Sequence, residues 1–491
     1  MPSTMTHTDV LSPAPILEAV ERYRGTIIDL DASRKIEPDE FARAREALIV
    51  ALSQAGLRSG DRVVMALGNG PAFIAALSGI LACEGSPLLV HAKTPAAELH
   101  RYAQRFGAKF LACEANSGLE LASIASVTQT IELLDHCVIR WGTFDGKYDP
   151  IAGPVLRGVP LHPSSGSTGS PKIALRPGFA ALEEARHYAA TMGIGEDDAI
   201  MAIPPMSHAY GYGMCVMAPL LTGADIITTS RFSIQLIRRA LVDHGITILP
   251  TVPAMLDELS LGTGTDLRQV RCVLVAGAVL PQRSAKVFRS KTGVTAFPLY
   301  GTTETGGISV GTCATGGNVD GRVGPPMDGV EVEVRSSDLD LSESGMGKLF
   351  VRSSSLMAGY LDDHGQITNP APDGWFETGD LARVDEDRTI HLRGRDSEAI
   401  NMSGLKVVPC EVEEVIAQLP GVLEVKVYGA QHCWGGQVVK AAVAVDGRLS
   451  EADIRGHCEQ HLVYYKRPHA IALVNALPRT PNGKVDRSQL T

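Results

Sequence analysis

The residues from Ser164 to Lys172, SSGSTGSPK, have the composition of a phosphate-binding loop. Glycine lets a backbone approach a polyanion closely, and consecutive N–H groups and hydroxyls can then cradle phosphate oxygens. The pattern differs from a Walker loop, because Ser170 and Pro171 separate Gly169 from the lysine and no Ser or Thr follows it. Apolar residues on both sides, GVPL and IAL, favour a loop between two strands over a flexible linker.

A second segment that could do chemistry is LYGTTETGG, from Leu299 to Gly307. Glu304 is a single acid among hydroxyls and glycines, and a carboxylate near a phosphate loop suits Mg²⁺, because this hard ion favours oxygen. The ring of Tyr300 could stack on a nucleotide base. Taken alone, the motif also fits a capped turn in which threonine and glutamate side chains bond to the backbone.

Three isolated charged residues follow in turn-like surroundings. Asp380 lies in a Thr-Gly-Asp sequence that we interpret as a turn, and its carboxylate could bind both hydroxyls of a ribose. Arg395 comes later, at the expected end of a hairpin. Lys484 lies in PRTPNGKVDR, where Pro and Asn-Gly predict an exposed turn that could bring a positive charge to a reacting phosphate. Each residue alone also fits a surface turn or a frayed terminus.

Strands that alternate with helices must position these residues. Strands are predicted at RVVMALGN, SPLLVH, KFLACEA, HCVIRW, DAIMAIPP, ADIITTS and CVLVAGAVL, and PAFIAALSGILACEG predicts a helix. Such alternation indicates parallel α/β sheets, which bind ligands at the carboxyl ends of their strands. After about Gly321, short alternating segments predict antiparallel β structure. We expect a large α/β domain at 1–395 that includes a β-rich subdomain, a small α+β domain at 396–491, and a loose end from Met1 to Pro15.

The composition argues against several classes of function. The chain has 491 residues, 44% of them hydrophobic, and a formal net charge of −10. Large cores can therefore form, whereas affinity for nucleic acid or acidic membranes is disfavoured. Nine scattered cysteines without CxxC or metal-like spacing indicate reduced thiols in a cytoplasmic protein. The N-terminal residues do not resemble a secretory signal, and no apolar run approaches the ~20 residues that span a bilayer.

Together, these motifs resemble the adenylate-forming superfamily, which includes acyl-CoA synthetases, firefly luciferase and the adenylation domains of peptide synthetases. That family has a Ser/Thr/Gly-rich loop ending in Pro-Lys, then Tyr-Gly-x-Thr-Glu, Thr-Gly-Asp, Gly-Arg and a late Pro-x-Thr-x-x-Gly-Lys, and all five occur here in that order. The resemblance covers nearly the whole chain beyond the first few dozen residues. It implies parallel-type α/β sheets in the large domain and a small, mobile C-terminal domain.

The resemblance implies a role for each matching residue. The β- and γ-phosphates of ATP would be held by Ser164, Ser165, Gly166, Ser167, Thr168, Gly169 and Lys172. The adenine would lie among Gly277, Ala278, Tyr300 and Gly301, and Thr302 belongs to the same nucleotide site. Thr303 would contact the α-phosphate, Glu304 would bind Mg²⁺, and Asp380 would bind the ribose with Arg395 beside it. Lys484 would bridge the substrate carboxylate and the α-phosphate.

The segment PMSHAYGYG, residues 205–213, is similar to the part of the family that contacts the acid, with His208 at the usual aromatic or histidine position. Ala209 and Tyr210 follow where amino-acid-activating relatives usually carry an Asp, which argues against an α-amino acid. The residues expected to line the acid site are apolar or small and so favour a hydrophobic acid. They are Met206, Tyr210, Tyr212, Met214, Gly277, Gly306 and Gly307.

The expected hinge after Arg395 departs from the family pattern at two positions. Ser397 stands where a Lys or Asp is usual, and Asn401 stands where a second Lys is common. Small polar residues can still absorb the change in backbone angles, but lysine contacts at the hinge are in doubt. The following MSGLKVVPCEVEEVI matches the family, and the resemblance implies that Ser403, Gly404 and Leu405 edge the pantetheine tunnel.

The leading hypothesis is an AMP-forming acid–thiol ligase. With ATP and Mg²⁺ it would convert a hydrophobic fatty or aryl acid to an acyl-adenylate, release pyrophosphate, and transfer the acyl group to coenzyme A. A second hypothesis transfers the acyl group to the phosphopantetheine of a carrier protein. A third, from another class, is an inactive binding or scaffold protein with this fold; the presence of Glu304, Asp380, Arg395 and Lys484 argues against it. The resemblance leaves monomer or homodimer open.

Overall fold

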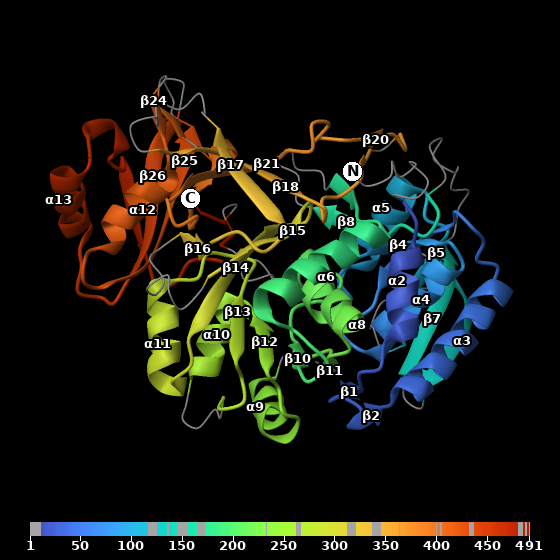
Figure 1. The fold of residues 1–491 in the computed structure, drawn as a ribbon. Helices are drawn as coiled ribbons and strands as arrows, with labels where there is room; N and C mark the ends of the chain where they lie inside the picture. Colours follow the sequence, from blue (N-terminus) through green and yellow to red (C-terminus); the bar gives the residue numbers. More distant parts are fainter. Residues whose placement is uncertain are drawn as a thin grey trace.

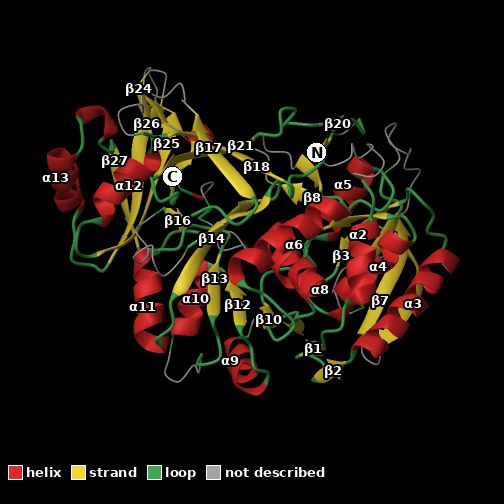
Figure 2. Cartoon of the chain, in the orientation of Figure 1, coloured by secondary structure: helices red, strands yellow, loops and turns green. Residues whose placement is uncertain are grey.

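The chain was analysed as a computed structural model (Figures 1 and 2). The residues it describes are 11–115, 125–134, 137–144, 156–164, 172–231, 233–261, 267–311, 321–335, 345–362, 364–398, 400–402, 405–431, 437–479, 485–486 and 489–490. The fold is α/β, with two large mixed sheets, a smaller antiparallel sheet and a small C-terminal α+β unit, as predicted.

The first large sheet carries the strands on either side of the Ser/Gly loop. Its nine strands have the order β20-β19-β9-β8-β4-β3-β5-β7-β6. The strands are β3 Arg62–Ala66, β4 Ser86–Leu89, β5 Phe110–Glu114, β6 Ala125–Leu134, β7 Cys137–Phe144, β8 Leu161–Ser164, β9 Lys172–Leu175, β19 Gly359–Leu361 and β20 Ile367–Thr368. Strands β3, β4 and β5 are parallel, as expected. The expected alternation with helices fails at HCVIRW, because β6 and β7 form an antiparallel hairpin that pairs directly with β5.

The second large sheet brings LYGTTETGG to the carboxyl edge of a parallel set. Its order is β15-β14-β13-β12-β10-β11-β1-β2, and β10 to β14 run parallel. The strands are β1 Ile27–Asp29, β2 Arg34–Ile36, β10 Ala199–Ala202, β11 Asp225–Thr228, β12 Ile248–Thr251, β13 Cys272–Val275, β14 Ala296–Thr302 and β15 Gly306–Val310. Strand β15 folds back antiparallel to β14, so residues 303–305 form the turn between them.

Helices cover both sheets. The outer face of the second sheet packs on α9 Ile234–Asp243, α10 Pro253–Ser260 and α11 Gln282–Thr292. Between the sheets lie α2 Ala14–Arg22, α4 Pro71–Ala82, α6 Gly178–Met192 and α8 Ala218–Thr222 (Figure 1). Helix α3 Pro38–Gln54 packs on α4, and α5 Ala96–Phe106 covers the far face of the first sheet. The short helix α7 Ala209–Tyr212 continues into a π-helical turn, Gly213–Met217.

The prediction of a loose end from Met1 to Pro15 is wrong at its last residues, and residues 1–10 lie outside the described residues. Helix α2 begins at Ala14, and Ile16 is fully buried in the core between the two sheets. The proline at position 15 fits the first turn of a helix, because the missing N–H has no partner there in any case. The apolar face of this helix, buried on α6 and α8, therefore holds the segment in place.

The β-rich subdomain and the small C-terminal unit also form as predicted. The antiparallel sheet has the order β16-β22-β21-β18-β17. Its strands are β16 Arg322–Gly324, β17 Val330–Arg335, β18 Gly347–Ser353, β21 Phe376–Val384 and β22 Ile390–Arg395. The C-terminal unit contains β23 Ile400–Met402, β24 Leu405–Val407, α12 Pro409–Ala417, β25 Val422–Gln431, β26 Gln437–Val445, α13 Glu451–His461 and β27 Ala470–Val474. This unit has a hydrophobic core of its own. The division of the chain into domains at 1–395 and 396–491 stays a proposal.

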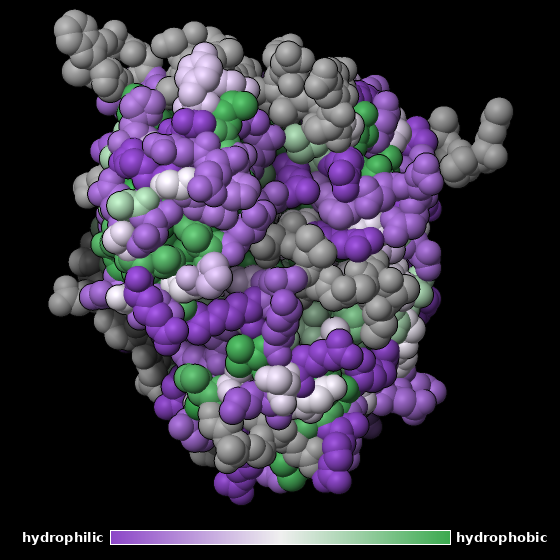
Figure 3. Space-filling model, turned by 90° about the vertical axis from the view of Figure 1, so that its left-hand side faces the viewer, coloured by the Kyte–Doolittle hydropathy of each residue, from purple (hydrophilic) through white to green (hydrophobic). Residues whose placement is uncertain are grey.

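The surface agrees with a chain of ordinary globular composition. Figure 3 views the molecule from the side of α12 and α13, and most of the coloured surface is hydrophilic with small, scattered hydrophobic areas. Among the described residues, no helix combines the length and apolar character needed to cross a membrane.

Candidate active site

The Ser/Gly loop joins two paired strands, as predicted. Strands β8 and β9 are antiparallel, and Ser164 lies opposite Lys172 at the end of their ladder. The loop residues between them, Ser165, Gly166, Ser167, Thr168 and Gly169 included, lie outside the described residues. The loop therefore leaves the first sheet at the end of β8 and returns to it at the start of β9.

Tyr360 links Lys172 of this loop to Glu304. Strand β19 pairs with β9, and the Lys172 Nζ lies 4.9 Å from the centre of the Tyr360 ring. The Tyr360 hydroxyl donates a 2.7 Å hydrogen bond to Glu304 Oε1. Burial, and then the Glu304 charge, raise the pKa of Tyr360, so the hydroxyl keeps its proton. The sequence analysis did not identify Tyr360; its position beside Lys172 depends on the pairing of two strands that are far apart in the chain.

A second carboxylate is held by the predicted base-stacking tyrosine. Tyr300 Oη donates a 2.6 Å hydrogen bond to Asp380 Oδ2, and Arg395 Nε lies 3.2 Å from Asp380 Oδ1. Asp380 and Arg395 are register partners in β21 and β22, which confirms that Arg395 ends a hairpin. The prediction that Asp380 lies in a turn is wrong. Asp380 lies within β21, where the strand ladder is irregular between Asp380 and Ala382. Gly379 has φ +77°, and this local distortion explains the turn-like sequence.

The charge on Asp380 is only partly compensated. Burial raises the pKa of Asp380, and the positive charge of Arg395 and the hydrogen bond from Tyr300 oppose this rise without cancelling it. Burial also raises the pKa of Tyr300, so its hydroxyl remains a donor. The result is a carboxylate on a rigid strand with lone pairs still available to a ligand.

The turn between β14 and β15 is held from both sides. Thr305 N donates to Thr302 Oγ1 at 3.1 Å, so the predicted capped turn is present. Thr303 O accepts a 3.0 Å hydrogen bond from Arg176 Nη1, and Glu304 O accepts one of 2.8 Å from Met357 N. The Glu304 side chain bonds to Tyr360, however, and so contributes to the site in addition to the turn.

The remaining predicted nucleotide residues lie along the same edge. Gly277 and Ala278 are exposed directly after β13, and Gly277 has φ +86°, a left-handed conformation that favours glycine. Strand β13 is parallel to β14, which ends at Thr302, so Gly277 and Ala278 follow the strand next to Tyr300 and Gly301. This is the edge at which open parallel sheets bind ligands.

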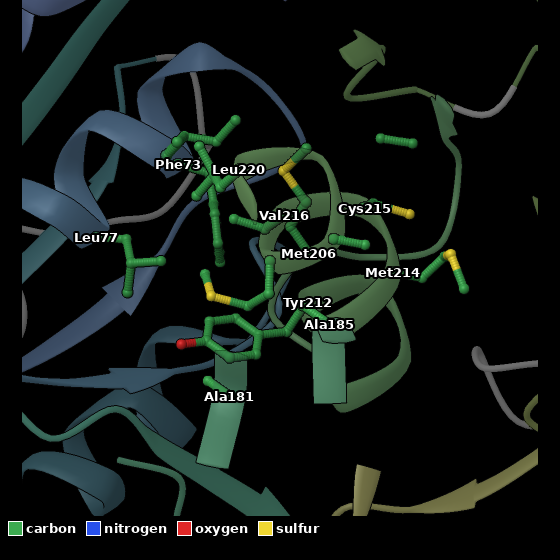
Figure 4. Packing of buried hydrophobic residues seen from close by; sticks show 14 of the residues in the cluster. Phe73, Leu77, Ala181, Ala185, Met206, Tyr212, Met214, Cys215, Val216 and Leu220 are labelled. Atoms are coloured by element: carbon green, nitrogen blue, oxygen red, sulfur yellow. The ribbon is translucent and has the colours of Figure 1, made fainter. Parts of the chain in front are cut away.

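The residues predicted to contact the acid are divided between the core and a partly exposed segment. Met206, Tyr212 and Met214 are buried with Ala181, Ala185 and Leu220 (Figure 4). His208 and Tyr210 are less buried, and the Tyr210 hydroxyl donates to Leu274 O at 3.3 Å. The rings of His208 and His91 lie 6.1 Å apart. Gly306 and Gly307 are buried against Glu184 and Tyr188.

Asn69 holds the 205–213 segment, and the sequence analysis did not identify it. Its Nδ2 donates to the carbonyls of Ala202, Ile203 and Pro204 at 2.8, 3.2 and 3.0 Å. Its Oδ1 accepts a 2.8 Å hydrogen bond from Met206 N. The predicted strand RVVMALGN was too long, because β3 ends at Ala66 and Asn69 lies in the loop that follows. Only the tertiary structure places that loop beside residues 202–206.

Several predicted residues cannot be placed. Lys484, Ser403 and Gly404 lie outside the described residues, and for Leu405 only the backbone, in β24, is described. The structure thus brings together Lys172, Glu304, Asp380 and Arg395 with the two tyrosines, and leaves the roles of all of them as predictions.

Comparison with known families decides the class of protein. A family model described as "AMP-binding enzyme" matches residues 18–361, and a second, "AMP-binding enzyme C-terminal domain", matches residues 411–484. The chain belongs to the AMP-binding enzyme family. It is an adenylate-forming enzyme of the acyl-CoA synthetase type, so the predicted class, an acid–thiol ligase, is confirmed.

Relatives of this AMP-binding enzyme include two CoA ligases. A 2-succinylbenzoate–CoA ligase of Bacillus mycoides (strain KBAB4) is 29% identical over 337 residues, which cover 67% of this chain and 68% of that one. The 3-[(3aS,4S,7aS)-7a-methyl-1,5-dioxo-octahydro-1H-inden-4-yl]propanoyl:CoA ligase of Mycobacterium tuberculosis (strain ATCC 25618 / H37Rv) is 28% identical over 486 residues, covering 93% and 94%.

Solved structures confirm the fold of this AMP-binding enzyme. ATP-bound MatB from Rhodopseudomonas palustris superposes with a TM-score of 0.81 at 21% identity, covering 97% of this chain and 98% of that one. The O-succinylbenzoate coenzyme A synthetase MenE from Bacillus subtilis, in complex with ATP and a magnesium ion, gives a TM-score of 0.76 at 22% identity, covering 98% and 99%. At these identities the likeness concerns the fold alone.

Proposed function

We propose that this enzyme uses ATP and Mg²⁺ to convert a hydrophobic carboxylic acid, fatty or aryl, to an acyl-adenylate, and then transfers the acyl group to the thiol of coenzyme A. The observation that carries the proposal is the pair of tyrosine-held carboxylates, Glu304 in the turn after β14 and Asp380 in β21, which is bonded to Tyr300 of β14. The names of the two CoA ligases support the same reaction class.

The nucleotide would lie along the carboxyl edge of β13 and β14. Among the described residues, Asp380 Oδ1 contacts Arg395 and Oδ2 accepts from Tyr300, which leaves lone pairs for the two ribose hydroxyls. Gly277 and Ala278 offer exposed backbone for the adenine on the neighbouring strand end. The Ser164–Lys172 loop would hold the β- and γ-phosphates from the facing sheet, and Thr303 would contact the α-phosphate.

Glu304 fits a magnesium ion that is held mainly by phosphate. The described residues contain no group of three or more side chains that could cage a metal by themselves. Mg²⁺ commonly binds through one or two carboxylates together with substrate phosphates, so a single carboxylate suits it. Tyr360 occupies one side of Oε1 and leaves Oε2 for the ion. When bound, the ion would neutralise negative charge that develops on the phosphates.

The proposed reaction needs alignment rather than a protein nucleophile. A carboxylate oxygen attacks the α-phosphorus, and the bond from that phosphorus to pyrophosphate breaks. The CoA sulfur then attacks the acyl carbon, the bond to the AMP oxygen breaks, and the thiol proton leaves to solvent. Lys484 would bridge the carboxylate and the α-phosphate, and His208 would border the reacting acid. Ser403, Gly404 and Leu405 would edge the path of the pantetheine.

The proposal of a hydrophobic acid rests on the 205–213 segment. His208 and Tyr210 are the ring-bearing members of this segment that are partly exposed, and both follow the buried Met206. The segment contains no Asp, Glu, Lys or Arg that could recognise a second charge on the acid. An acid with an apolar body therefore matches these side chains best.

Pyrophosphate release from a panel of aliphatic and aryl acids, with ATP and Mg²⁺, tests the first half-reaction. CoA and a phosphopantetheinylated carrier protein, offered in parallel, separate the two acceptors. Release with at least one acid and thioester formation with CoA are expected. Thioester formation only on the carrier would favour the alternative acceptor, and release with no acid would contradict the proposed function.

A further inference from the structure

A buried ion pair lies directly behind the turn that carries Thr303 and Glu304. Arg176 follows β9, and Glu184 lies in α6; their side chains are 1% and 0% exposed, and Arg176 Nη2 lies 2.7 Å from Glu184 Oε2. Neither residue belongs to the motifs that the sequence analysis identified. Both are too deeply buried to touch a nucleotide themselves, so any function must act through their neighbours.

The pair holds the turn on both sides of Glu304. Arg176 Nη1 donates a 3.0 Å hydrogen bond to the carbonyl of Thr303. Glu184 Oε1 accepts a 3.2 Å hydrogen bond from Gly307 N and one of 2.9 Å from the Tyr188 hydroxyl. The two guanidinium nitrogens thus connect the carboxylate to the turn in one planar fork, an arrangement that lysine cannot reproduce.

The same carboxylate also lies against the acid segment. A Cβ on Gly213, at the start of the π-helical turn, would overlap the Glu184 carboxylate, and so would a Cβ on Gly306. Two backbones therefore approach the Glu184 carboxylate closely, one just after residues 205–212 and one just after Glu304. Glu184 thereby sets the spacing between the segment proposed to contact the acid and the turn proposed to contact the nucleotide.

Stability does not account for this pair. Removing two charges from water is unfavourable, and replacing a buried ion pair with well-packed hydrophobic residues of similar volume is often neutral or stabilising. Among the described residues, Arg176 Nε has no hydrogen-bond partner, and neither ring nitrogen of the buried His162 nor the Tyr212 hydroxyl has one. A cluster optimised for stability would satisfy these groups.

We propose that Arg176 and Glu184 are positioning residues: they fix Thr303 and Glu304 relative to the 205–213 segment, for formation of the acyl-adenylate. The proposal rests on the proposed function, because the roles of Thr303 and Glu304 belong to it. A displacement of about 1 Å in such an aligned site can lower a rate by about a hundredfold.

Two variants separate positioning from charge and from stability. Arg176→Lys keeps the charge opposite Glu184 but cannot also reach the Thr303 carbonyl. The double variant Arg176→Gln with Glu184→Gln replaces the ion pair with a neutral amide pair. Both should fold, and the double variant should unfold at a urea concentration no lower than that of the wild type. Arg271→Lys is the matched control, because Arg271 pairs with Asp198 at 2.7 Å and has no bond to the turn.

Pyrophosphate exchange should fall about tenfold or more in both variants, which corresponds to ~1.4 kcal/mol or more in activation free energy. Thioester formation from supplied acyl-adenylate and CoA should fall much less, and Arg271→Lys should change neither. A general defect in folding would lower both steps together and would overturn the proposal, as would exchange at the wild-type rate in both variants.

Calorimetry of AMP binding offers a test that requires no knowledge of the acid substrate. The affinity for AMP should weaken about tenfold in Arg176→Lys, because Thr303 is proposed to contact the α-phosphate. If wild-type enzyme binds AMP but activates no acid, the proposed function fails while the positioning role is still tested by this affinity. Equal AMP affinity in the wild type and in Arg176→Lys would overturn the positioning role.

Discussion

At the scale of single residues, the charge on Asp380 opposes folding. Burial raises the pKa of Asp380 above that of the unfolded chain, despite the opposing effects of Arg395 and Tyr300. Stability from the protonated carboxyl is therefore present below the unfolded pKa and is lost as the pH rises through the folded pKa. A buried, incompletely compensated carboxylate beside a parallel-sheet edge is typical of a functional site.

Replacing Asp380 with asparagine should separate stability from function. Near neutral pH, Asp380→Asn should unfold at a urea concentration at least as high as that of the wild type, because the variant buries no charge. Its KM for ATP should rise about tenfold or more, since hydrogen bonds to a charged group contribute about 1.5–3 kcal/mol. The difference in stability should shrink as the pH falls toward the unfolded pKa. A variant that is less stable only near neutral pH would contradict this account.

Tyr360→Phe should specifically weaken the use of magnesium. The variant removes the hydroxyl that orients Glu304 Oε1, without changing any charge. The Mg²⁺ concentration that gives half-maximal pyrophosphate exchange should rise about tenfold, again from the loss of one hydrogen bond to a charged group. Tyr464→Phe, at a side chain that is 74% exposed, serves as the control. An unchanged Mg²⁺ requirement would argue against Glu304 as the metal ligand.

At the scale of elements, the loop after β3 is fastened to the segment that leads into α7. Asn69 makes four hydrogen bonds to the backbone of residues 202–206. Asn69→Asp keeps the size of the side chain but loses the Nδ2 donors and places a carboxylate against three carbonyls. The KM for the acid should rise about tenfold or more, with little change in the KM for ATP, since each buried group left without a partner costs ~1–3 kcal/mol. Equal changes in both constants would indicate general damage.

The turn between β14 and β15 requires glycine at Gly306 for two reasons. Its φ is +72°, and a Cβ there would overlap Glu184. Gly193, which ends α6, has φ +62° but open space around it, so Gly193→Ala measures backbone strain alone. Urea unfolding should show a loss of about 1 kcal/mol for Gly193→Ala and a further ~1–3 kcal/mol for Gly306→Ala. If the two variants lose the same free energy of unfolding, the Glu184 side chain moves away from the added methyl group without cost.

At the scale of the whole molecule, ion pairs and one small apolar cluster join the described part of the C-terminal unit to the rest of the chain. Arg393 of β22 binds Glu414 of α12, and Lys348 lies 3.2 Å from Asp396. Leu381 packs with Val408 and Cys410 in a small cluster separate from the C-terminal core. Lys172 belongs to the first large sheet, whereas Lys484 lies in the sequence of the small domain proposed for 396–491. If both lysines act on one ATP molecule, the two parts of the chain must close around it.

Lys484→Ala tests this requirement. Pyrophosphate exchange should fall by about a hundredfold or more, because a charge that stabilises a transition state is commonly worth ~3–4 kcal/mol. Thioester formation from supplied acyl-adenylate should be retained, and the urea midpoint should not change, because the residue lies in a terminal segment. Exchange near the wild-type rate would exclude the role proposed for Lys484.

The sequence by itself determined the class of fold, the family and the order of the motifs, because Gly, Pro and hydroxyl-rich segments mark turns and phosphate loops by local chemistry. It did not determine that Asp380 lies in a strand, or that β6 and β7 pair beside β5, since register depends on partners far along the chain. Only the tertiary structure decided which side chains support the motifs. Tyr360, Asn69, Arg176 and Glu184 carry no local signal, and each acts through contacts more than fifty residues distant in sequence.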